Sequence, residues 1–498
     1  MFRYIVSITI TLFSFLLLPH TSKTQESWVR AYGSETLFES PKSVNITPDN
    51  GFIITGWITS ENSLYQVKTD ASGLQDWENF ITVDYPHQIS PNFIENFETG
   101  EFILISRIED NDDPFDDSSD IFILKINEAG DILHEEMIDI GFTDRITEFK
   151  RVSANEFVLG GYAENENGDS SNVYLAYIND QGELTSKRVL PAIYREELDA
   201  LDVTLDGGVI LIGERRGTEV PYDLRTFLIK IRSGGLTDWS RSYNNSYLNN
   251  IHKIRLTSQG DYIVLRGTYK KLYLVKLDPQ GNILWQSDGY DFENSYQPFG
   301  SSLLETSNGG FAYIGSIRNQ RTTTYGEIYE DNNLLLVKTD QNGHTLWAQN
   351  IGGIENEYSK QLLQLSDDSF LILGRKNYLD HPDQDIILIK TSVDGISPVF
   401  PEIPIILDHG FFPNPFHSKA NFFINLAEPR IIEIEIFTVR GRIVYKTEEF
   451  WFNRSYNKLS HVWSGLERDR LILPSGVYFY RITTNNGETA TGKVTFIK

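Results

Sequence analysis

Two acidic clusters carry the side chains best suited to chemistry, because carboxylate oxygens are the ligands that Ca²⁺ prefers. The first cluster contains six aspartates: Asp110, Asp112, Asp113, Asp116, Asp117 and Asp120. The second combines a histidine with three aspartates: Asp380, His381, Asp383 and Asp385. Neither has the glycine and terminal glutamate that an EF-hand loop places at fixed positions, so solvated acidic loops are the simpler explanation. We therefore expect no cofactor, and Ca²⁺ at the first cluster is the candidate exception.

The sequence contains none of the common catalytic motifs. It has no HExxH, no GxSxG and no glycine-rich phosphate loop. The absence of cysteine excludes a thiol nucleophile, disulfides and lipid attachment to an N-terminal cysteine. Carboxylates are so numerous that no pair stands out for glycoside hydrolysis. We assign no catalytic residue, and the sequence leans against an enzyme without excluding one.

A repeat of about 54 residues sets the elements that would position any functional side chain. One motif, for example VKLDPQGNILW (275–285), is an apolar strand followed by a glycine-containing turn. Its seven copies have these turn glycines: Gly73, Gly130, Gly182, Gly235, Gly281, Gly343 and Gly395. A second motif, such as DNGFIITGW (49–57), is a polar turn leading into another apolar strand, and it alternates with the first. Each period thus holds four short strands, which is the make-up of one propeller blade.

The last period indicates how the ring closes. It lacks a fourth strand and runs instead into a proline-rich exit, SPVFPEIP. The segment SWVRAYGS (27–34) resembles LWAQNIGG (346–353), a fourth strand of an earlier period. Closing the ring with this segment removes the unpaired strand edges that an open row of sheets would leave. The sequence therefore predicts an all-β fold with a seven-bladed propeller over residues 25–400, closed by its N-terminal strand.

The repeated motif resembles the tryptophan-docking motif of pyrroloquinoline-quinone propeller proteins, and double glycines such as Gly207–Gly208 resemble those of kelch repeats. A ligand site needs residues that differ between repeats, whereas these residues recur. We expect the Asp or Asn to bond to turn amides, the Gly to adopt positive φ, and the Trp to pack between blades.

Binding is expected where the repeats differ. The loops between the second and third strands of each period vary widely in length and sequence, and they share a face with the loops that connect the periods. Tyrosines in these segments could stack on sugar rings. The predicted ligand-binding face consists of Tyr222, Tyr243, Tyr247, Tyr290, Tyr296, Tyr325 and Tyr378.

The first residues read as a secretory signal peptide, assigned to 1–24. Arg3 precedes an apolar run over residues 5–18 that is shorter than the roughly 20 residues of a membrane span. We expect no membrane insertion of the mature chain. The net charge of −25 argues against nucleic acid as a partner and permits cations or basic proteins.

A separate unit follows a linker at 401–410. In residues 411–498 the repeat ends, and apolar and polar residues alternate around turns such as Arg440-Gly441 and Asn486-Gly487. About seven short strands of this kind predict a small β-sandwich.

This unit resembles the type A C-terminal sorting domain of the type IX secretion system. The match includes a Phe-Pro-Asn-Pro-Phe start, a mid-domain glycine turn, Ser-Gly-Val-Tyr and a final Gly-Lys. The sorting-signal residues that the resemblance implies are Pro413, Asn414, Pro415, Gly441, Gly476, Val477, Tyr478 and Lys493. It implies recognition by the type IX secretion machinery, and a secreted or cell-surface location in a Gram-negative bacterium.

Three functions fit these features. The favoured one is a non-catalytic binding or adhesion propeller with an extracellular glycan or protein as its ligand. The alternatives are an extracellular glycan-active enzyme and a structural or scaffolding protein of the cell envelope.

Overall fold

The computed structural model describes the chain from residue 27 onwards, except for residues 34–37, 86–88, 98, 110–118, 193–194, 218–223, 245–247, 292–294, 323–327, 353–354, 378–383, 393–405, 427–429, 448–449, 453–460, 467–471 and 485–488. The predicted signal peptide lies outside the described residues. Within them, strands dominate, and no helix has the length and apolar character needed to cross a membrane.

Seven sets of four antiparallel strands, numbered here as blades in chain order, make up most of the described chain. Blade 1 contains β2 (Glu39–Ile46), β3 (Phe52–Ile58), β4 (Ser63–Thr69) and β5 (Gln75–Thr82), with the 3₁₀ helix η1 (Thr59–Glu61) between β3 and β4. Blade 2 contains β6 (Pro91–Asn96), β7 (Phe102–Glu109), β8 (Ser119–Ile126) and β9 (Ile132–Ile138). Blade 3 contains β10 (Thr143–Ser153), β11 (Glu156–Glu164), β12 (Ser171–Asn179) and β13 (Leu184–Leu190). A single parallel bridge, Thr143 to Ser119, joins blades 2 and 3.

The remaining blades repeat this order. Blade 4 contains β14 (Arg195–Val203), β15 (Val209–Arg216), β16 (Leu224–Ile231) and β17 (Thr237–Asn244). Blade 5 contains β18 (Ile251–Leu256), β19 (Tyr262–Gly267), β20 (Lys271–Leu277) and β21 (Ile283–Gln286), and β22 (Tyr290–Asp291) also pairs with β20. Blade 6 contains β23 (Ser295–Glu305), β24 (Phe311–Thr322), β25 (Ile328–Thr339) and β26 (Thr345–Ile351). Blade 7 contains β27 (Asn356–Gln364), β28 (Phe370–Asn377), β29 (Gln384–Lys390) and β1 (Trp28–Tyr32).

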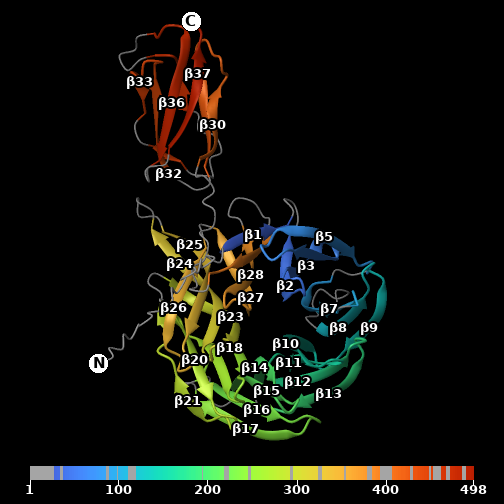
Figure 1. Ribbon diagram of the computed structural model, residues 1–498. Coiled ribbons are helices and arrows are strands. Elements are labelled where there is room, and N and C mark those ends of the chain that lie inside the picture. Colours follow the sequence, from blue (N-terminus) through green and yellow to red (C-terminus); the bar gives the residue numbers. More distant parts are fainter. Residues whose placement is uncertain are drawn as a thin grey trace, which may run out of the picture.

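The blades form a closed ring, with the first strand of each blade innermost (Figure 1). Each of seven apolar cores contains side chains from two neighbouring blades. One core joins blade 7 to blade 1: it includes Trp28 of β1, Leu388 of β29 and Phe52 of β3. An open row of seven blades would have one interface fewer. The predicted all-β propeller is confirmed, the N-terminal strand pairs as the fourth strand of the last blade, and the seven cores fit a closed ring.

The repeated motif shapes the turn between the third and fourth strands. Asp278 accepts hydrogen bonds from the turn amides of Gln280 (3.0 Å) and Asn282 (2.7 Å), and Gly281 has φ of 81°. The Lys of the motif lies opposite the Trp in the strand register, and it reaches an acidic residue of the preceding turn, as in Lys276–Asp261 at 3.0 Å. The motif therefore ties together two turns of its own blade.

Motif tryptophans make contacts between neighbouring blades. The ring of Trp28 packs on Phe52 of the next blade, with ring centroids 6.0 Å apart, and lies against Gly73 in that blade's turn. Trp285 contacts Gly343 in the same way. The expectation that every motif tryptophan is buried between blades is wrong for Trp77, which is 45% exposed.

The C-terminal strands form two facing sheets. One contains β30 (Ile406–Phe412), β31 (Ala420–Leu426) and β35 (His461–Trp463). The other contains β33 (Ile443–Lys446), β32 (Arg430–Phe437), β36 (Gly476–Thr484) and β37 (Thr489–Phe496), with β34 (Phe450–Phe452) paired to β32. Side chains of both sheets, among them Phe422, Trp463, Ile434 and Tyr480, form one core. The predicted β-sandwich is confirmed.

Candidate ligand site at the centre of the ring

The innermost strand of every blade contains a β-bulge at the same place. At this place the register between the first and second strands shifts by one residue in all seven blades, which leaves one residue there without a partner; blades 3 and 6 have a second shift elsewhere in the same strand pair. A bulge changes the direction in which a strand presents its side chains, and bulges are common beside functional sites. The seven unpaired residues are Lys42, Asn92, Thr147, Asp199, His252, Ser301 and Lys360.

A repeated glycine in the second strand makes room for most of these bulges. A Cβ atom added to Gly213 would lie 2.1 Å from the carbonyl oxygen of Glu197 in the bulged strand, and one added to Gly374 would lie 2.6 Å from that of Tyr358. Gly56, Gly161 and Gly315 have the same relation to the strand beside them. The glycines recur while the unpaired residues differ from blade to blade, and that difference is what a specific site requires.

Charged side chains from different blades meet at the centre. Lys253 of blade 5 contacts Glu148 of blade 3, with Nζ 2.7 Å from Oε2, although blade 4 lies between them in the ring. Lys150 lies 3.3 Å from the other oxygen of Glu148. Lys360 of blade 7 reaches across blade 1 to the ring of Phe93 in blade 2, with Nζ 5.8 Å from the centroid.

We call these residues, with the cations that act on them, the central cluster: Lys42, Glu148, Lys150, Lys253, Arg255, Lys360 and Arg375. The side chains of Lys150 and Lys253 are 23% and 20% exposed, so solvent reaches the cluster.

The electrostatics of the central cluster are dominated by positive charge. Burial alone would raise the pKa of Glu148, but the charges of Lys253, Lys150 and Arg255 hold it at about 2. Burial together with the charges of Lys360 and Arg375 lowers the pKa of Lys42 to about 7. The cluster thus has six cations and one carboxylate, and the charge of Asp202 outside it also acts on Lys150.

Two further bulge residues are also unusual. His252 is buried, its Nε2 has no hydrogen-bond partner within the described part of the chain, and burial lowers its pKa to about 4. Burial, and then the charges of Glu214 and Glu197, raise the pKa of Asp199 well above its usual range. Burial thus disfavours the charged form of both side chains.

The predicted aromatic face is only partly visible. Tyr222, Tyr247, Tyr325 and Tyr378 lie outside the described residues, and for Tyr296 only its place in β23 is described. Tyr243 donates a hydrogen bond to the carbonyl of Gly281 in the next blade, and burial raises its pKa to about 12. Tyr290 packs against the core between blades 5 and 6. A ligand role for this face stays a prediction.

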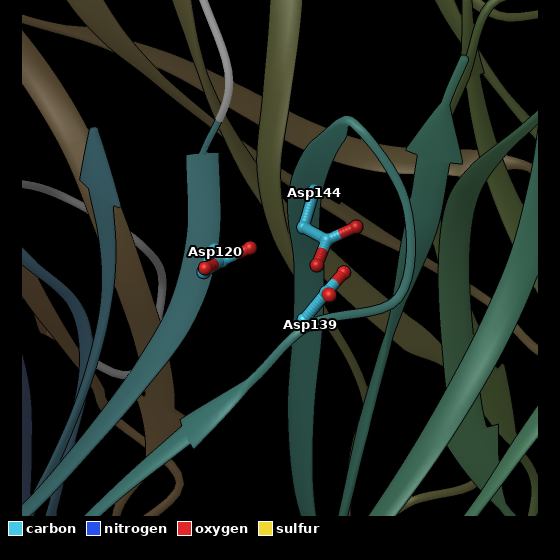
Figure 2. A group of neighbouring side chains, drawn as sticks. All are labelled: Asp120, Asp139 and Asp144. Carbon is cyan, nitrogen blue, oxygen red and sulfur yellow. The ribbon is translucent and has the colours of Figure 1, made fainter. Parts of the chain in front are cut away.

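Of the predicted calcium cluster, only Asp120 lies within the described residues. Its side chain points from β8 toward Asp139 and Asp144, which the sequence did not single out (Figure 2). One ligand atom of each of the three lies within 4.8 Å of the other two, and such a set suits Ca²⁺. However, the Asp144 oxygens already accept hydrogen bonds from the amides of Ile140 (3.0 Å) and Gly141 (3.1 Å). Burial, and the nearby charges of Asp120 and Asp139, raise the pKa of Asp144 to about 7. Calcium binding stays a prediction.

The second acidic cluster is described only at Asp385, in β29, because Asp380, His381 and Asp383 lie outside the described residues. Nothing in the described chain brings a metal set together around Asp385. The sequence missed the central cluster, because its members come from strands of four different blades. The trailing glycine of the second motif was the signal that could have revealed the bulges.

The sorting-signal residues gather near the end of the last strand. Asn414, between Pro413 and Pro415, donates to the carbonyl of Lys493 (3.0 Å) and accepts from the amide of Thr495 (2.8 Å). The first and last parts of the predicted signature are thus hydrogen-bonded to each other.

The remaining signature residues occupy turns and strand starts. Gly441 adopts φ of 80° in the turn before β33. Tyr478 is buried in β36 and donates to the carbonyl of Pro474, close to Gly476, while Val477 faces outward with 41% of its surface exposed.

The comparisons with known proteins bear on the C-terminal unit. The family described as "Secretion system C-terminal sorting domain" matches residues 410–497. A search of curated proteins finds no match.

Solved propeller structures are similar only remotely. "YCF48 bound to D1 peptide" is 13% identical over 75% of this chain and 96% of that chain, with a TM-score of 0.41. The β-propeller domain of the trilobed protease from Pyrococcus furiosus is 9% identical over 73% and 98%, with a TM-score of 0.38. An α-L-arabinanase from Penicillium chrysogenum complexed with arabinobiose is 10% identical over 74% and 98%, also with a TM-score of 0.38. Identities this low carry no information about a ligand.

The sorting domain identifies the export route. Because that domain marks cargo of the type IX secretion system, the chain is destined for the cell surface or the medium of a Gram-negative bacterium. The chain is a β-propeller protein that carries a type IX secretion C-terminal sorting domain.

Proposed function

We propose that this chain is an exported binding protein, whose propeller holds an extracellular ligand at the centre of the ring without changing it chemically. The observation that carries this proposal is that the recurring and the non-recurring residues of the repeat occupy different places. The recurring residues have structural contacts, as in the Lys276–Asp261 pair and the Asp278 turn. Residues that differ between blades occupy the unpaired bulge positions of the innermost strands.

The protonation states of Glu148 and His252 favour binding over proton transfer. A general acid or base works best when its pKa lies near the working pH. Glu148, with a pKa of about 2, stays ionised and bound to two lysines. His252, with a pKa of about 4, stays neutral. These groups can attract and orient a ligand, and they are poorly matched to proton transfer at neutral pH.

The proposal is tested with the full-length protein recovered from the medium or surface of an expressing bacterium. The protein is immobilised and offered a panel of glycans and peptides, and each retained ligand is then analysed by mass spectrometry. Saturable binding with the ligand recovered intact is the expected result. Conversion of a retained glycan into shorter products would overturn the proposal in favour of a glycan-active enzyme. Binding confined to proteins of the cell envelope would overturn it in favour of a scaffold.

A further inference from the structure

The central cluster contains three cations that form no ion pair with a carboxylate of the described chain, although the charge of Glu148 acts on one of them, Lys360. Lys42 belongs to β2, Lys360 to β27 and Arg375 to β28, so they come from the two blades that close the ring. Within the described residues, Lys42 has no ion pair, Lys360 contacts the ring of Phe93, and Arg375 lies over the ring of Tyr358, with Cζ 4.7 Å from the centroid.

Like charges in such proximity repel each other. The charges of Lys360 and Arg375 both act on Lys42, and Arg375 also acts on Lys360. Surface lysines avoid this repulsion by spreading into solvent, but these side chains are partly buried. A protein with a net charge of −25 also has a large excess of carboxylates available as partners. Three basic side chains without an ion pair at the centre of an acidic chain are therefore a specific feature of this site.

The backbone around the cations is held in place. Lys42 and Lys360 are the unpaired bulge residues of adjacent blades. Directly beside them, the side-chain amide of Gln361 accepts a hydrogen bond from the amide of Val44 (3.0 Å) and donates one to its carbonyl (3.2 Å). This two-way bond fixes the two innermost strands relative to each other. The backbone at the two lysines is therefore positioned before any ligand arrives, which lowers the entropy that binding must overcome.

A hydrogen-bond donor without a partner lies beside the cations. The hydroxyl oxygen of Ser43, the residue after Lys42, is buried and has no hydrogen-bond partner within the described part of the chain. An unsatisfied buried hydroxyl is unfavourable, and an oxygen of a bound ligand would satisfy it.

We propose that Lys42, Lys360 and Arg375 form a binding site for an oxyanion, that is, the carboxylate, phosphate or sulfate group of a ligand. This inference rests on the proposed binding function and names the chemistry of the bound group. The cations supply charge-assisted hydrogen bonds, which are about twice as strong as neutral ones. The charge of Glu148 acts on Lys360 and limits the positive charge there, and the three cations together favour a ligand with more than one negative charge.

Binding at this site takes up a proton near neutral pH. Lys42 has a pKa of about 7, and the charged groups that act on it are Lys360 of β27 and Arg375 of β28. A bound anion favours the protonated ammonium and raises this pKa. The affinity is therefore highest below pH 7 and falls as the pH rises above it.

The test uses isothermal titration calorimetry of the full-length protein with citrate and with inorganic pyrophosphate, at constant ionic strength. Lys42→Gln and Lys360→Gln keep the length of the side chain and remove its charge. Lys270→Gln, at an exposed position in the turn between β19 and β20, is the matched control. Circular dichroism and thermal unfolding establish that each variant is folded.

We expect at least one probe to bind the wild type, with at least tenfold weaker binding in Lys42→Gln and in Lys360→Gln and unchanged binding in Lys270→Gln. We also expect proton uptake at pH 7, seen as a dependence of the binding heat on the buffer, and loss of that uptake in Lys42→Gln. Equal affinity of Lys42→Gln and the wild type would overturn the site, as would failure of both probes to bind.

The two proposals can fail separately. Phosphorus NMR follows the pyrophosphate after titration. Its hydrolysis by the wild type, together with weaker binding in Lys42→Gln, would refute the non-catalytic function and leave the oxyanion site standing. Retention of a neutral glycan with unchanged affinity in Lys42→Gln would refute the oxyanion site and leave the binding function standing.

Discussion

Replacement of Trp28 by alanine should weaken the closure of the ring far more than the same replacement at Trp77. The two residues occupy equivalent places, each opposite the motif lysine of the neighbouring strand. Trp28 is 8% exposed and packs on Phe52 of the next blade, whereas Trp77 is 45% exposed. Removal of a buried tryptophan costs about 3–5 kcal/mol. Removal of one that is nearly half exposed should cost roughly half as much, since the loss scales with buried area.

The assay combines urea unfolding with hydrogen exchange. Trp28→Ala should lower the free energy of unfolding by about 3–5 kcal/mol, and Trp77→Ala by about 2 kcal/mol. Because β1 pairs with β29 through five residue pairs, the amides of β29 should lose protection in Trp28→Ala. In Trp77→Ala the amides of β29 should stay protected, because β5 belongs to another blade.

Two results would refute this reasoning. Equal losses of stability in the two variants would show that the buried area of the closing strand contributes nothing special. Unchanged protection of β29 in a destabilised Trp28→Ala would show that β1 is held by its backbone pairing and not by the packing of Trp28.

Three further variants test other parts of the structure. Glu148 has a folded-state pKa of about 2, below its unfolded value of 4.5, so the stability that its charge contributes is present above pH 4.5 and is lost as the pH falls toward 2. In Glu148→Gln, urea titrations should therefore show a free energy of unfolding that depends less on pH in this range, by about 3 kcal/mol. An unchanged pH dependence would contradict the ion pairing. Gly213→Ala places a Cβ atom 2.1 Å from the Glu197 carbonyl oxygen, so it should lower the melting temperature and reduce the free energy of unfolding by about 1–3 kcal/mol. Gly476→Ala is the control, because its Cβ atom meets no other atom within 4 Å and the melting temperature should not change. Asn414→Ala removes two hydrogen bonds to the last strand. Cell fractionation should then show more protein retained in the periplasm and less on the surface or in the medium. Normal export would exclude Asn414 from the sorting signal.

The fold was predictable because its information is local and repeated. The turn glycines and alternating strands mark each blade, and the likeness of residues 27–34 to a fourth strand places β1 beside β29. The tryptophans illustrate the limit of this approach. The motif gives Trp28 and Trp77 the same place in the register, yet the neighbouring blade covers one and leaves the other half exposed.

The central cluster was not predictable for a related reason. Lys253 and Glu148 are 105 residues apart and lie in blades that are not neighbours, so no window of sequence contains both. Their contact depends on the diameter of the ring and on bulges that turn the side chains. The sequence signal for a bulge is a single glycine in the partner strand, and it says where a side chain is redirected but not what it will meet.

This separation suggests how such a repeat can acquire a specific site without losing its fold. The glycines opposite the bulges and the Lys–Asp ion pairs belong to the structural part of the repeat. Substitution of such a glycine causes a steric clash, and substitution of the lysine or aspartate removes an ion pair. The bulge residue itself makes no ladder pair, so its side chain can change from lysine to serine at little cost to the sheet. Because seven such positions surround one centre, a few substitutions alter its charge while the seven apolar cores between blades stay intact. Positive charge at Lys42 and Lys360 is then best explained by what the centre binds, since the structural part of the repeat does not require it.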